Sequence, residues 1–516
     1  MMKLPPKWMF FFTILFFATQ AQSPAGDYFL TIGGGYAPTG NQISLEKNVQ
    51  LFQQLVQERF PNNPSHTVLF SDGKSPGRDL QYRDPKLVIP PVNRILAQIF
   101  GKEGDLAYQY RSHQVKDVAG GASRKNIQQW FEKTGAGLKP GDRVFIYVTA
   151  HGGESDNRRQ PYNTTLYLWN GEKISVTEFS KLLDKIPDPV DIMTVMVQCH
   201  CGGFADLIFN QADPTKGTSK ASRCGFFATV YDRPAAGCTP DINEKEYQEY
   251  STYFWEAIRG VTRTGKPIGT CDYDQDGSVS FSEAHAYAVL TSTTIDISVS
   301  TSDSFLRAYG KSTTSNSGAT SSLLTSDSPY TQLLSRATPV QKAILNGLSE
   351  QLKLTAQNRG KEAWELAQQV SSQKQQPNRD LRTKNRELAS LRKELRSLLT
   401  KAWPELNNPF NPALPKLLAE QSKQILASAA KHPRYDRSVQ LQKEVDQLQS
   451  QLLNLDRRWA KAQRLLRALE TVALAANLPK VASKEIQQRY TQLLKAEAGT
   501  FGGVDATVAE KSQPSN

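Results

Sequence analysis

The chain has 516 residues, 39% hydrophobic and 22% charged, which excludes a collagen-like or wholly disordered polymer. Five cysteines exclude a disulfide-dense miniprotein, and a mean hydropathy of −0.49 with one apolar run excludes a polytopic membrane protein. Residues 331–516 hold 30 Lys and Arg against 17 Asp and Glu, so the basic excess lies in the C-terminal part. We interpret it as the solvated face of helices and expect no nucleic-acid partner, since no nucleic-acid motif accompanies it.

The first residues follow the plan of a secretory signal peptide. Two lysines precede an apolar run at residues 9–18, and small residues precede a cleavage site after Ala21. The run is shorter than the roughly 20 residues of a membrane span, although an uncleaved anchor stays open. We expect a secreted or periplasmic protein with no membrane span after cleavage. That compartment permits disulfides, and the spacing of Cys224 and Cys238 allows one bridge.

From Asp27 onward, apolar runs alternate with segments of helical spacing. Strands are expected at 27–35, 66–72, 144–153, 191–199 and 224–232. Helices are expected at 44–60, 124–135 and 174–186. This alternation predicts an α/β fold, with a mostly parallel sheet flanked by helices. In such sheets, functional residues gather at the carboxyl ends of the strands.

The C-terminal part is expected to be helical. Residues 299–328 are rich in Ser and Thr, which is typical of a linker or surface loop. A helix is expected over 334–372. Beyond it, apolar residues recur with the spacing of a coiled coil along two seams. The seams comprise Leu381, Leu388, Leu391, Leu395 and Leu398, and then Val445, Leu448, Leu452, Leu455, Trp459, Ala462, Leu466, Leu469 and Ala473. We predict a helical hairpin that mediates self-association or docks a partner.

Two of the predicted strands end in residues capable of nucleophilic chemistry. One ends in His151-Gly152-Gly153 and the other in Cys199, followed by His200 and Cys201. Because parallel strands present their carboxyl ends at one edge, His151 and Cys199 can meet although they are far apart in sequence. A cysteine nucleophile needs a base and backbone donors for an oxyanion, and the flanking glycines free the backbone to approach a substrate. The pair therefore favours a Cys/His site over two unrelated core residues.

The segments VFIYVTAHGG and VMVQCHCGGFAD resemble the strand-His-Gly and strand-Cys-x-(Ser/Gly)-Gly segments of caspase-like cysteine peptidases. Over residues 27–290 the chain is most similar to the legumain family. The resemblance implies a caspase–haemoglobinase fold and hydrolysis of peptide bonds in a protein or peptide substrate. It assigns the nucleophile to Cys199, the histidine to His151, and the oxyanion donors to the N–H groups of Gly152 and Cys199.

The chain also departs from that family. Cys201 occupies the position of the usual Ser or Gly, and Val197 that of an acidic residue of legumains, which argues against asparagine specificity. Residues 251–258 resemble a segment that forms an acidic wall of the legumain substrate pocket, which implies that Glu256 contacts substrate and favours a basic residue there. His200, next to the nucleophile, is a second candidate for substrate contact.

Residues 272–283 match the twelve-residue EF-hand loop. Carboxylates supply hard oxygen ligands, Gly277 permits the sharp turn, and the final glutamate can bind bidentately. The candidate ligands of Ca²⁺ are Asp272, Asp274, Asp276, Ser278, Ser280 and Glu283. A single loop without a paired second loop favours a structural ion over a regulatory one, and a metal-free acidic turn is the alternative.

The expected division of the chain follows from these segments. It comprises a signal peptide at 1–21, a caspase/legumain-like peptidase domain with the calcium loop at 24–310, a Ser/Thr-rich linker at 311–333, a helical coiled-coil region at 334–499 and a disordered tail at 500–516. We expect an exported, calcium-stabilised cysteine endopeptidase whose residues 24–310 suffice for activity. The alternative is a catalytically silent calcium-binding interaction module with a coiled-coil tail.

Overall fold

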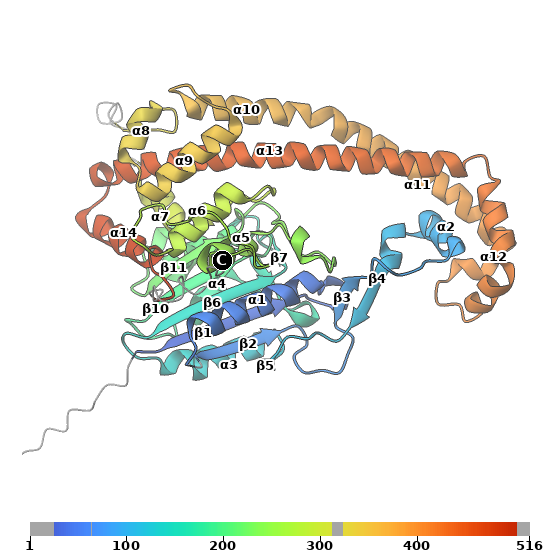
Figure 1. The fold of residues 1–516 in the computed structure, drawn as a ribbon, viewed down its shortest axis with the longest axis horizontal. Helices are drawn as coiled ribbons and strands as arrows, with labels where there is room; N and C mark the ends of the chain where they lie inside the picture. Colours follow the sequence, from blue (N-terminus) through green and yellow to red (C-terminus); the bar gives the residue numbers. More distant parts are fainter. Residues whose placement is uncertain (1–24, 63, 312–322, 503–516) are drawn as a thin grey trace, which may run out of the picture.

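Seven strands form one sheet at the centre of the computed structural model, which describes residues 25–62, 64–311 and 323–502 (Figure 1). Across the sheet they are β12 (Val299–Ser300), β11 (Ser222–Phe227), β10 (Asp191–Met196), β6 (Arg143–Ala150), β1 (Asp27–Gly34), β2 (Ser65–Phe70) and β5 (Val118–Gly120). Neighbouring strands pair in parallel, except that β12 is antiparallel to β11. The predicted mostly parallel sheet is confirmed.

Smaller strands and helices surround this sheet. The short strands are β3 (Leu80–Arg83) with β4 (Tyr108–Arg111), and β7 (Gly152–Gly153) with β8 (Thr165–Tyr167) and β9 (Lys173–Ser175). The helices are α1 (Ile43–Arg59), α2 (Pro91–Phe100), α3 (Arg124–Lys133), α4 (Val176–Leu183), α5 (Tyr250–Arg259), α6 (Phe281–Thr291) and α7 (Thr301–Tyr309). These short strands and β5 and β12 carry too few apolar residues to have been predicted.

The helices cover both faces of the sheet. α1 leads from β1 to β2, and α4 leads from β6 to β10 in the opposite direction, so right-handed crossovers place them on opposite faces. The face of α1 also holds α5, because the rings of Phe52 and Trp255 lie 4.7 Å apart. α3 packs on α4 through Phe131 and Phe179. The strand order reverses beside β1, which is where open α/β sheets form their binding crevice.

The C-terminal part is helical, as predicted, and forms a long hairpin (Figure 1). Its helices are α8 (Tyr330–Arg336), α9 (Pro339–Leu352), α10 (Arg359–Gln373), α11 (Gln375–Ala402), α12 (Leu414–Ala430), α13 (Tyr435–Val481) and α14 (Lys484–Glu497). α10 and α11 run along α13, and every position of the longer predicted seam is buried or half-buried. In the shorter seam Leu398 is exposed, and the fully buried Leu399 takes its place.

The single helix expected over 334–372 is wrong. The chain breaks between α9 and α10, where Lys353 adopts a left-handed conformation with φ of 58°. The expectation of a linker from residue 299 is also wrong, because residues 299–309 form β12 and α7. The Ser300 side chain caps α7, and the Asp303 carboxylate accepts from the Ser300 N–H in return. Residues 312–322 and the expected signal peptide lie outside the described residues.

The helical region shares the core of the sheet, so it is not the separate unit that the sequence predicted. Leu474 and Leu478 of α13 and Tyr490 of α14 belong to the same hydrophobic cluster as β1 and β6. Phe501 is 4% exposed and packs on Phe145 at 5.0 Å between ring centroids, so the chain is ordered to residue 502, within the expected tail. We therefore expect that residues 24–310 alone do not fold to the active form.

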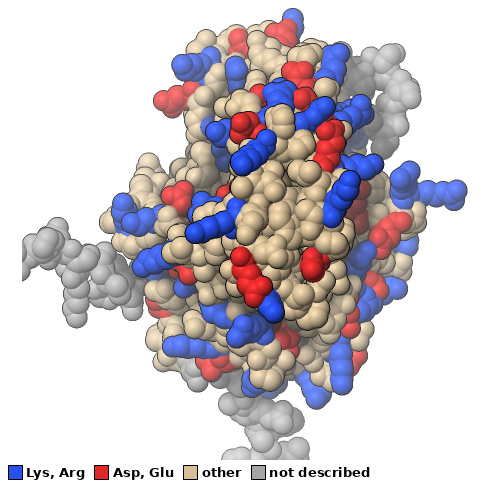
Figure 2. Space-filling view, turned by 90° about the vertical axis from the view of Figure 1, so that its right-hand side faces the viewer, with Lys and Arg blue, Asp and Glu red and all other residues tan. Residues whose placement is uncertain are grey.

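The far end of the hairpin, formed by α11 and α12, makes a separate contact with the sheet domain. α2, which belongs to the sheet domain, packs against α11 and α12, where Ile99 and Leu395 lie in one hydrophobic cluster. Figure 2 shows the face of the molecule at this end, with basic and acidic side chains interspersed around an uncharged centre. On this face, the charge excess is a solvated surface without a continuous basic patch.

Among the described helices, none combines the length and apolar character needed to cross a membrane.

One buried carboxylate of the shared core makes stability depend on pH. Glu497 of α14 accepts hydrogen bonds from the Thr301 hydroxyl and the Ser302 N–H, both at 2.7 Å, and burial raises its pKa to about 7. The folded protein therefore loses stability as pH rises from about 4.5 to 7, by roughly 3 kcal/mol.

Glu497→Gln keeps an acceptor without this titration. We expect the variant to gain stability over the parent at pH 8 and to lose that advantage at pH 5, as measured by urea unfolding at both pH values. A difference between the two proteins that does not change with pH would contradict this prediction.

Candidate active site

The structure brings His151 and Cys199 to the same edge of the sheet. β6 and β10 pair in register up to Val148 and Met196, and His151 and Cys199 each lie three residues further along the chain. The segments that follow β6 and β10 approach each other closely at Gly152. A Cβ atom added to Gly152 would lie 2.3 Å from the carbonyl oxygen of Cys199. Only glycine therefore fits at position 152. The structure thus brings the main chains of the three predicted catalytic residues together at one edge, and among the described residues Cys199 Sγ forms no hydrogen bond with the His151 ring.

The imidazole of His151 is oriented by the loop that follows β1. Its Nε2 atom lies 2.7 Å from the Gly40 carbonyl and 3.0 Å from Gln42 Oε1. Gln42 Nε2 donates to the Thr39 carbonyl, which fixes Oε1 as the atom facing the histidine. Nε2 must therefore carry the proton, and Nδ1 keeps its lone pair. Burial lowers the pKa of His151, so the ring is a neutral base at pH 7.

The N–H group of Gly152 is not used by the neighbouring strand. Tyr167 N–H donates to the His151 carbonyl at 2.9 Å, which makes residues 151 and 167 a hydrogen-bonded pair. In an antiparallel ladder the next pair, Gly152 and Leu166, is then not hydrogen-bonded. The Gly152 N–H consequently points away from β8 and is suited to donate to an oxyanion.

The thiol of Cys199 is half-buried beneath residues 233–238, which we call the capping segment. The Ala235 N–H donates to Cys199 Sγ at 3.3 Å, and the Ala235 carbonyl lies 3.8 Å from the same atom. Burial raises the pKa of Cys199, the Ala235 N–H lowers it, and nearby Asp296 raises it further. The group is therefore a neutral thiol at pH 7 in this conformation.

His200 holds the capping segment. Its φ of 61° turns the chain directly after Cys199. The His200 N–H donates to the Arg233 carbonyl at 2.9 Å, and its ring Nδ1 lies 2.9 Å from the Tyr231 carbonyl. The ring that the sequence placed against substrate thus supports the chain that follows β11.

The helical region holds the same segment from the other side. Asp456 of α13 forms a 2.7 Å ion pair with Arg233, and the guanidinium lies 4.6 Å from the Trp459 ring centroid. The Asp296 carboxylate accepts from the Ala236 N–H at 2.7 Å. Arg464 of α13 donates to the Asp296 carbonyl at 2.7 Å. Sequence reasoning missed this function of α13, because Trp459 fits the coiled-coil seam without any other signal.

A cleft of about 320 Å³ lies beside the capping segment. The sheet domain lines it with Gly202, Tyr231 and Ile297, and α13 lines it with Trp459 and Arg467. α13 therefore lines a cleft next to the segment that covers Cys199, whereas the sequence predicts a helical region apart from the catalytic residues.

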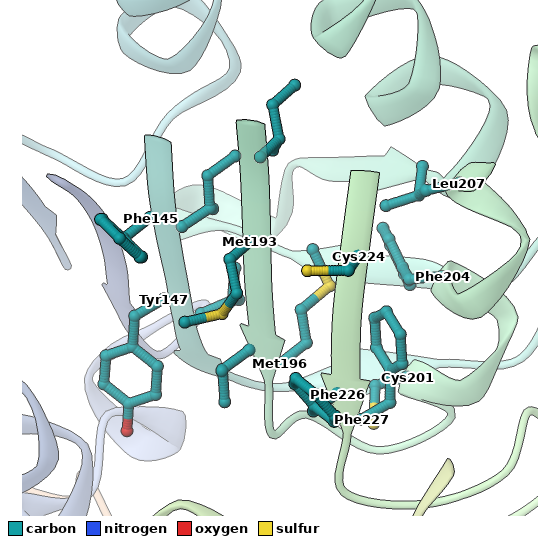
Figure 3. Packing of buried hydrophobic residues seen from close by; sticks show 14 of the residues in the cluster. Phe145, Tyr147, Met193, Met196, Cys201, Phe204, Leu207, Cys224, Phe226 and Phe227 are labelled. Carbon is teal, nitrogen blue, oxygen red and sulfur yellow. The ribbon is translucent and has the colours of Figure 1, made fainter. Parts of the chain in front are cut away.

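Cys201 belongs to the hydrophobic core. It is fully buried, and Figure 3 shows it next to Phe226 and Phe227 near the end of β11. The Thr229 N–H donates to its sulfur at 3.4 Å, and burial raises its pKa far above the usual thiol value. Between the two neighbouring cysteines, only Cys199 has the position and exposure of a nucleophile.

Glu256 does not lie with the dyad but at the end of α5, where its carboxylate accepts from the Arg263 N–H at 2.7 Å. Glu249 lies against the capping segment instead, because a Cβ atom added to Gly237 would lie 2.6 Å from its carboxylate. Burial raises the pKa of Glu249 to about 7 and that of Asp296 to about 6. One oxygen of each carboxylate has no hydrogen-bond partner among the described residues.

The predicted calcium loop is folded around its carboxylates. Ligand atoms of Asp272, Asp274 and Glu283 lie within 4.8 Å of one another. Gly277 has a φ of 90°, as the sharp turn requires. Glu283 also caps α6, since its carboxylate accepts from the Ser280 N–H and hydroxyl. These oxygen donors suit Ca²⁺.

Of the other three predicted positions, the two serines do not offer their side chains to an ion. Asp276 accepts from the Ser278 N–H and hydroxyl, so the Ser278 side chain is bound within the loop and its carbonyl is the group available to an ion. The Ser280 hydroxyl caps α6 instead.

The disulfide that the spacing of Cys224 and Cys238 allows is not formed, and all five cysteines are free thiols. Cys224 points into the core of the sheet beside Met193 (Figure 3), whereas Cys238 lies 4.0 Å from the Ala150 carbonyl at the carboxyl edge. Sequence spacing could not show that Cys224 lies within β11 whereas Cys238 lies beside the end of β6.

No family model and no curated protein matches this chain. Among solved structures, it has a TM-score of 0.28 and 12% identity to the crystal structure of protein GSU0716 from Geobacter sulfurreducens, over 51% of this chain and 88% of that one. A similarity at that level carries no argument about function. The chemistry of the site therefore rests on its own geometry.

Proposed function

We propose that the chain is an exported cysteine endopeptidase of the caspase–legumain type, which hydrolyses peptide bonds of a protein or peptide through Cys199 and His151. The single observation that carries this proposal is the strand register that brings Cys199 beside a neutral His151 whose Nδ1 is unprotonated. The mostly parallel sheet agrees with the caspase–haemoglobinase fold that the sequence resemblance implies. Export rests on the N-terminal sequence pattern.

In the proposed mechanism each residue has its own role. Cys199 transfers its proton to His151 Nδ1 as the sulfur attacks the scissile carbonyl carbon, and the N–H groups of Gly152 and Cys199 hold the oxyanion. The tetrahedral intermediate collapses to a thioester as the amine leaves with the proton from His151. Water then attacks the thioester and gives a proton to His151, which returns it to the sulfur as the acid is released.

This mechanism requires the capping segment to move. Ala235 covers the sulfur, so a substrate can reach it only after residues 233–238 withdraw. Once the sulfur is exposed, the burial that raises the pKa of Cys199 is relieved. The described conformation is therefore a resting state of the proposed enzyme.

The covered thiol of Cys199 also supports a second candidate function. A thiol held beneath Ala235 with a raised pKa is also what a catalytically silent interaction module would show. In that case α13 and its hairpin would serve to bind a partner, or a second copy of the chain.

Cleavage of a peptide library by the purified protein distinguishes the two functions. The peptidase predicts defined cleavage sites that are absent when Cys199→Ala is used at the same concentration. A library left intact by the parent protein in the presence of Ca²⁺ would favour the silent module. The identity of the residue before the cleaved bond would also show whether the acidic side chains of Glu249 and Asp296 influence substrate preference.

We further propose that residues 272–283 bind a structural Ca²⁺ ion through Asp272, Asp274, Asp276, Glu283 and the Ser278 carbonyl. The ion would link the segment before α6 to α6 itself, and α6 packs against the sheet through Phe281. Bound Ca²⁺ neutralises the repulsion among these carboxylates and takes no part in the catalytic steps above.

Removing Ca²⁺ is expected to lower the melting temperature. A ligand at about 100 times its Kd stabilises the native state by about 2.7 kcal/mol, and that amount is lost on chelation. Asp274→Ala should abolish the response to chelator, whereas the exposed Glu420→Ala should keep it. Identical melting curves of the parent protein with and without chelator would contradict a bound ion.

A further inference from the structure

Three side chains gather at the carboxyl end of β2, apart from the dyad and the calcium loop. Asp72 follows β2, Asp79 precedes β3, and His113 follows β4. A ligand atom of each lies within 4.8 Å of those of the other two. The proposed peptidase mechanism uses none of them.

The hydrogen bonds of this cluster leave two acceptor atoms without a donor. His113 Nε2 lies 2.7 Å from the Gly73 carbonyl, which can only accept, so Nε2 carries a proton and Nδ1 is the ring nitrogen left for a ligand. That Nδ1 atom and Asp72 Oδ1 are both buried, and neither has a hydrogen-bond partner among the described residues. Leaving two such buried atoms unpaired is unfavourable. A cation between them would remove that cost.

The third side chain is fixed in place by its neighbours. Asp79 is 2% exposed, and its Oδ1 accepts from the His113 N–H at 2.9 Å. Its Oδ2 accepts from Asn41 Nδ2 at 3.3 Å. Since a carboxylate oxygen has more than one lone pair, these bonds leave Asp79 able to bind an ion as well.

We propose that Asp72, Asp79 and His113 bind a divalent transition-metal ion, for which Zn²⁺ is the best match. One imidazole nitrogen with two carboxylate oxygens suits Zn²⁺, whereas Ca²⁺ takes oxygen ligands alone. The Gly73 carbonyl on the far nitrogen of His113 is the kind of outer partner that orients metal-binding histidines. Three protein ligands leave the fourth position of a tetrahedral ion to water.

The site is connected to the dyad through one buried residue. Asn41 Nδ2 donates to the Asp79 carbonyl and to Ser71 Oγ, both at 2.9 Å. Its chain neighbours are Gly40 and Gln42, which hold His151 Nε2. An ion on Asp79 would therefore stiffen the loop that orients His151. This consequence rests on the proposed function, whereas metal binding itself does not.

Metal titration of the full-length protein tests the proposal without measuring activity. Protein stripped with chelator is titrated calorimetrically with Zn²⁺, and the Co²⁺ form is examined for the visible absorption of a tetrahedral site. Both are carried out in Cys199→Ala protein, so that this thiol cannot bind the metal. We expect one Zn²⁺ per chain, and a Kd weaker by at least about tenfold in Asp72→Asn and His113→Gln.

Asp274→Ala in the calcium loop is the matched control and should leave Zn²⁺ binding unchanged. Far-UV circular dichroism checks that each variant is folded. If His113→Gln does not fold, Asp72→Asn with the Co²⁺ spectrum decides alone. No Zn²⁺ or Co²⁺ bound to the parent, or binding unaffected in folded Asp72→Asn, would overturn the proposal and leave the proposed peptidase function standing. In that case a proton shared by Asp72 and His113 would satisfy the two atoms.

Discussion

Cys199→Ala is expected to abolish peptide turnover, with a loss on the order of 10⁴-fold or more, while the protein stays folded. The reason is that Cys199 is the half-buried thiol beside His151, whereas Cys201 is fully buried in the core. His151→Ala should lose nearly as much, and the double variant should lose no more than either single one, because the two residues act as a unit. Steady-state cleavage of a peptide identified from the library measures all three.

Cys201→Ala is the matched control for this series. It removes a sulfur from the core and should cost about 1 kcal/mol of stability but retain turnover. A Cys201→Ala protein that is folded and inactive, beside a Cys199→Ala protein that still cleaves, would reverse the assignment of the nucleophile. Turnover equal to the parent in both Cys199→Ala and His151→Ala would eliminate the dyad.

Arg464→Ala should destabilise the protein by about 3–5 kcal/mol. Arg464 of α13 is 3% exposed and inserts into the sheet domain, where it donates to the carbonyls of Asp296 and Ser292 at 2.7 Å and of Thr294 at 3.0 Å. Burial lowers its pKa to about 10, so it remains charged at neutral pH. Truncation leaves those carbonyls and the Asp296 carboxylate without a cation. Denaturant unfolding of the full chain measures the loss.

Arg458→Ala, on the exposed face of the same helix, is the control and should change stability by less than about 0.5 kcal/mol. If Arg464→Ala were as stable as Arg458→Ala, the helical region would be a separate unit, as its sequence suggested. Arg464→Ala should also loosen the capping segment, since Asp296 binds Ala236. The expected sign is faster modification of Cys199 by a small alkylating reagent.

The sheet and the dyad were predictable because buried parallel strands are continuous apolar runs, and β6 and β10 each lead into a residue of distinct chemistry. The register that aligns His151 with Cys199 then follows from strand adjacency. The acidic loop at 272–283 was predictable for a different reason, since all positions of the EF-hand pattern lie within twelve consecutive residues. In both cases the chemical signal is local in sequence.

Other features depend on contacts between distant segments, which the sequence does not reveal. The composition of the Ser/Thr-rich stretch from residue 299 predicts a linker, although Ser300 is a helix cap. Composition alone does not distinguish a serine in a linker from one that caps a helix. Phe501 looked like part of a frayed tail, yet it fills a space between the rings of β1, β6 and α6.

The cluster proposed to bind zinc is equally hidden. Asp79 and His113 are 34 residues apart and become neighbours only through the pairing of β3 with β4. The capping segment gives no sequence signal either, because the main-chain atoms of Ala235 make its contact with Cys199.

The most direct test of the account is to identify which residue of the native protein reacts with an electrophilic peptide probe. The full-length protein is treated with a peptidyl acyloxymethyl ketone in the presence of Ca²⁺, digested and mapped by mass spectrometry. The proposed Cys199/His151 mechanism predicts a single modification at Cys199 that disappears in His151→Ala. Labelling at Cys238 instead, or labelling of Cys199 that is unchanged in His151→Ala, would contradict it.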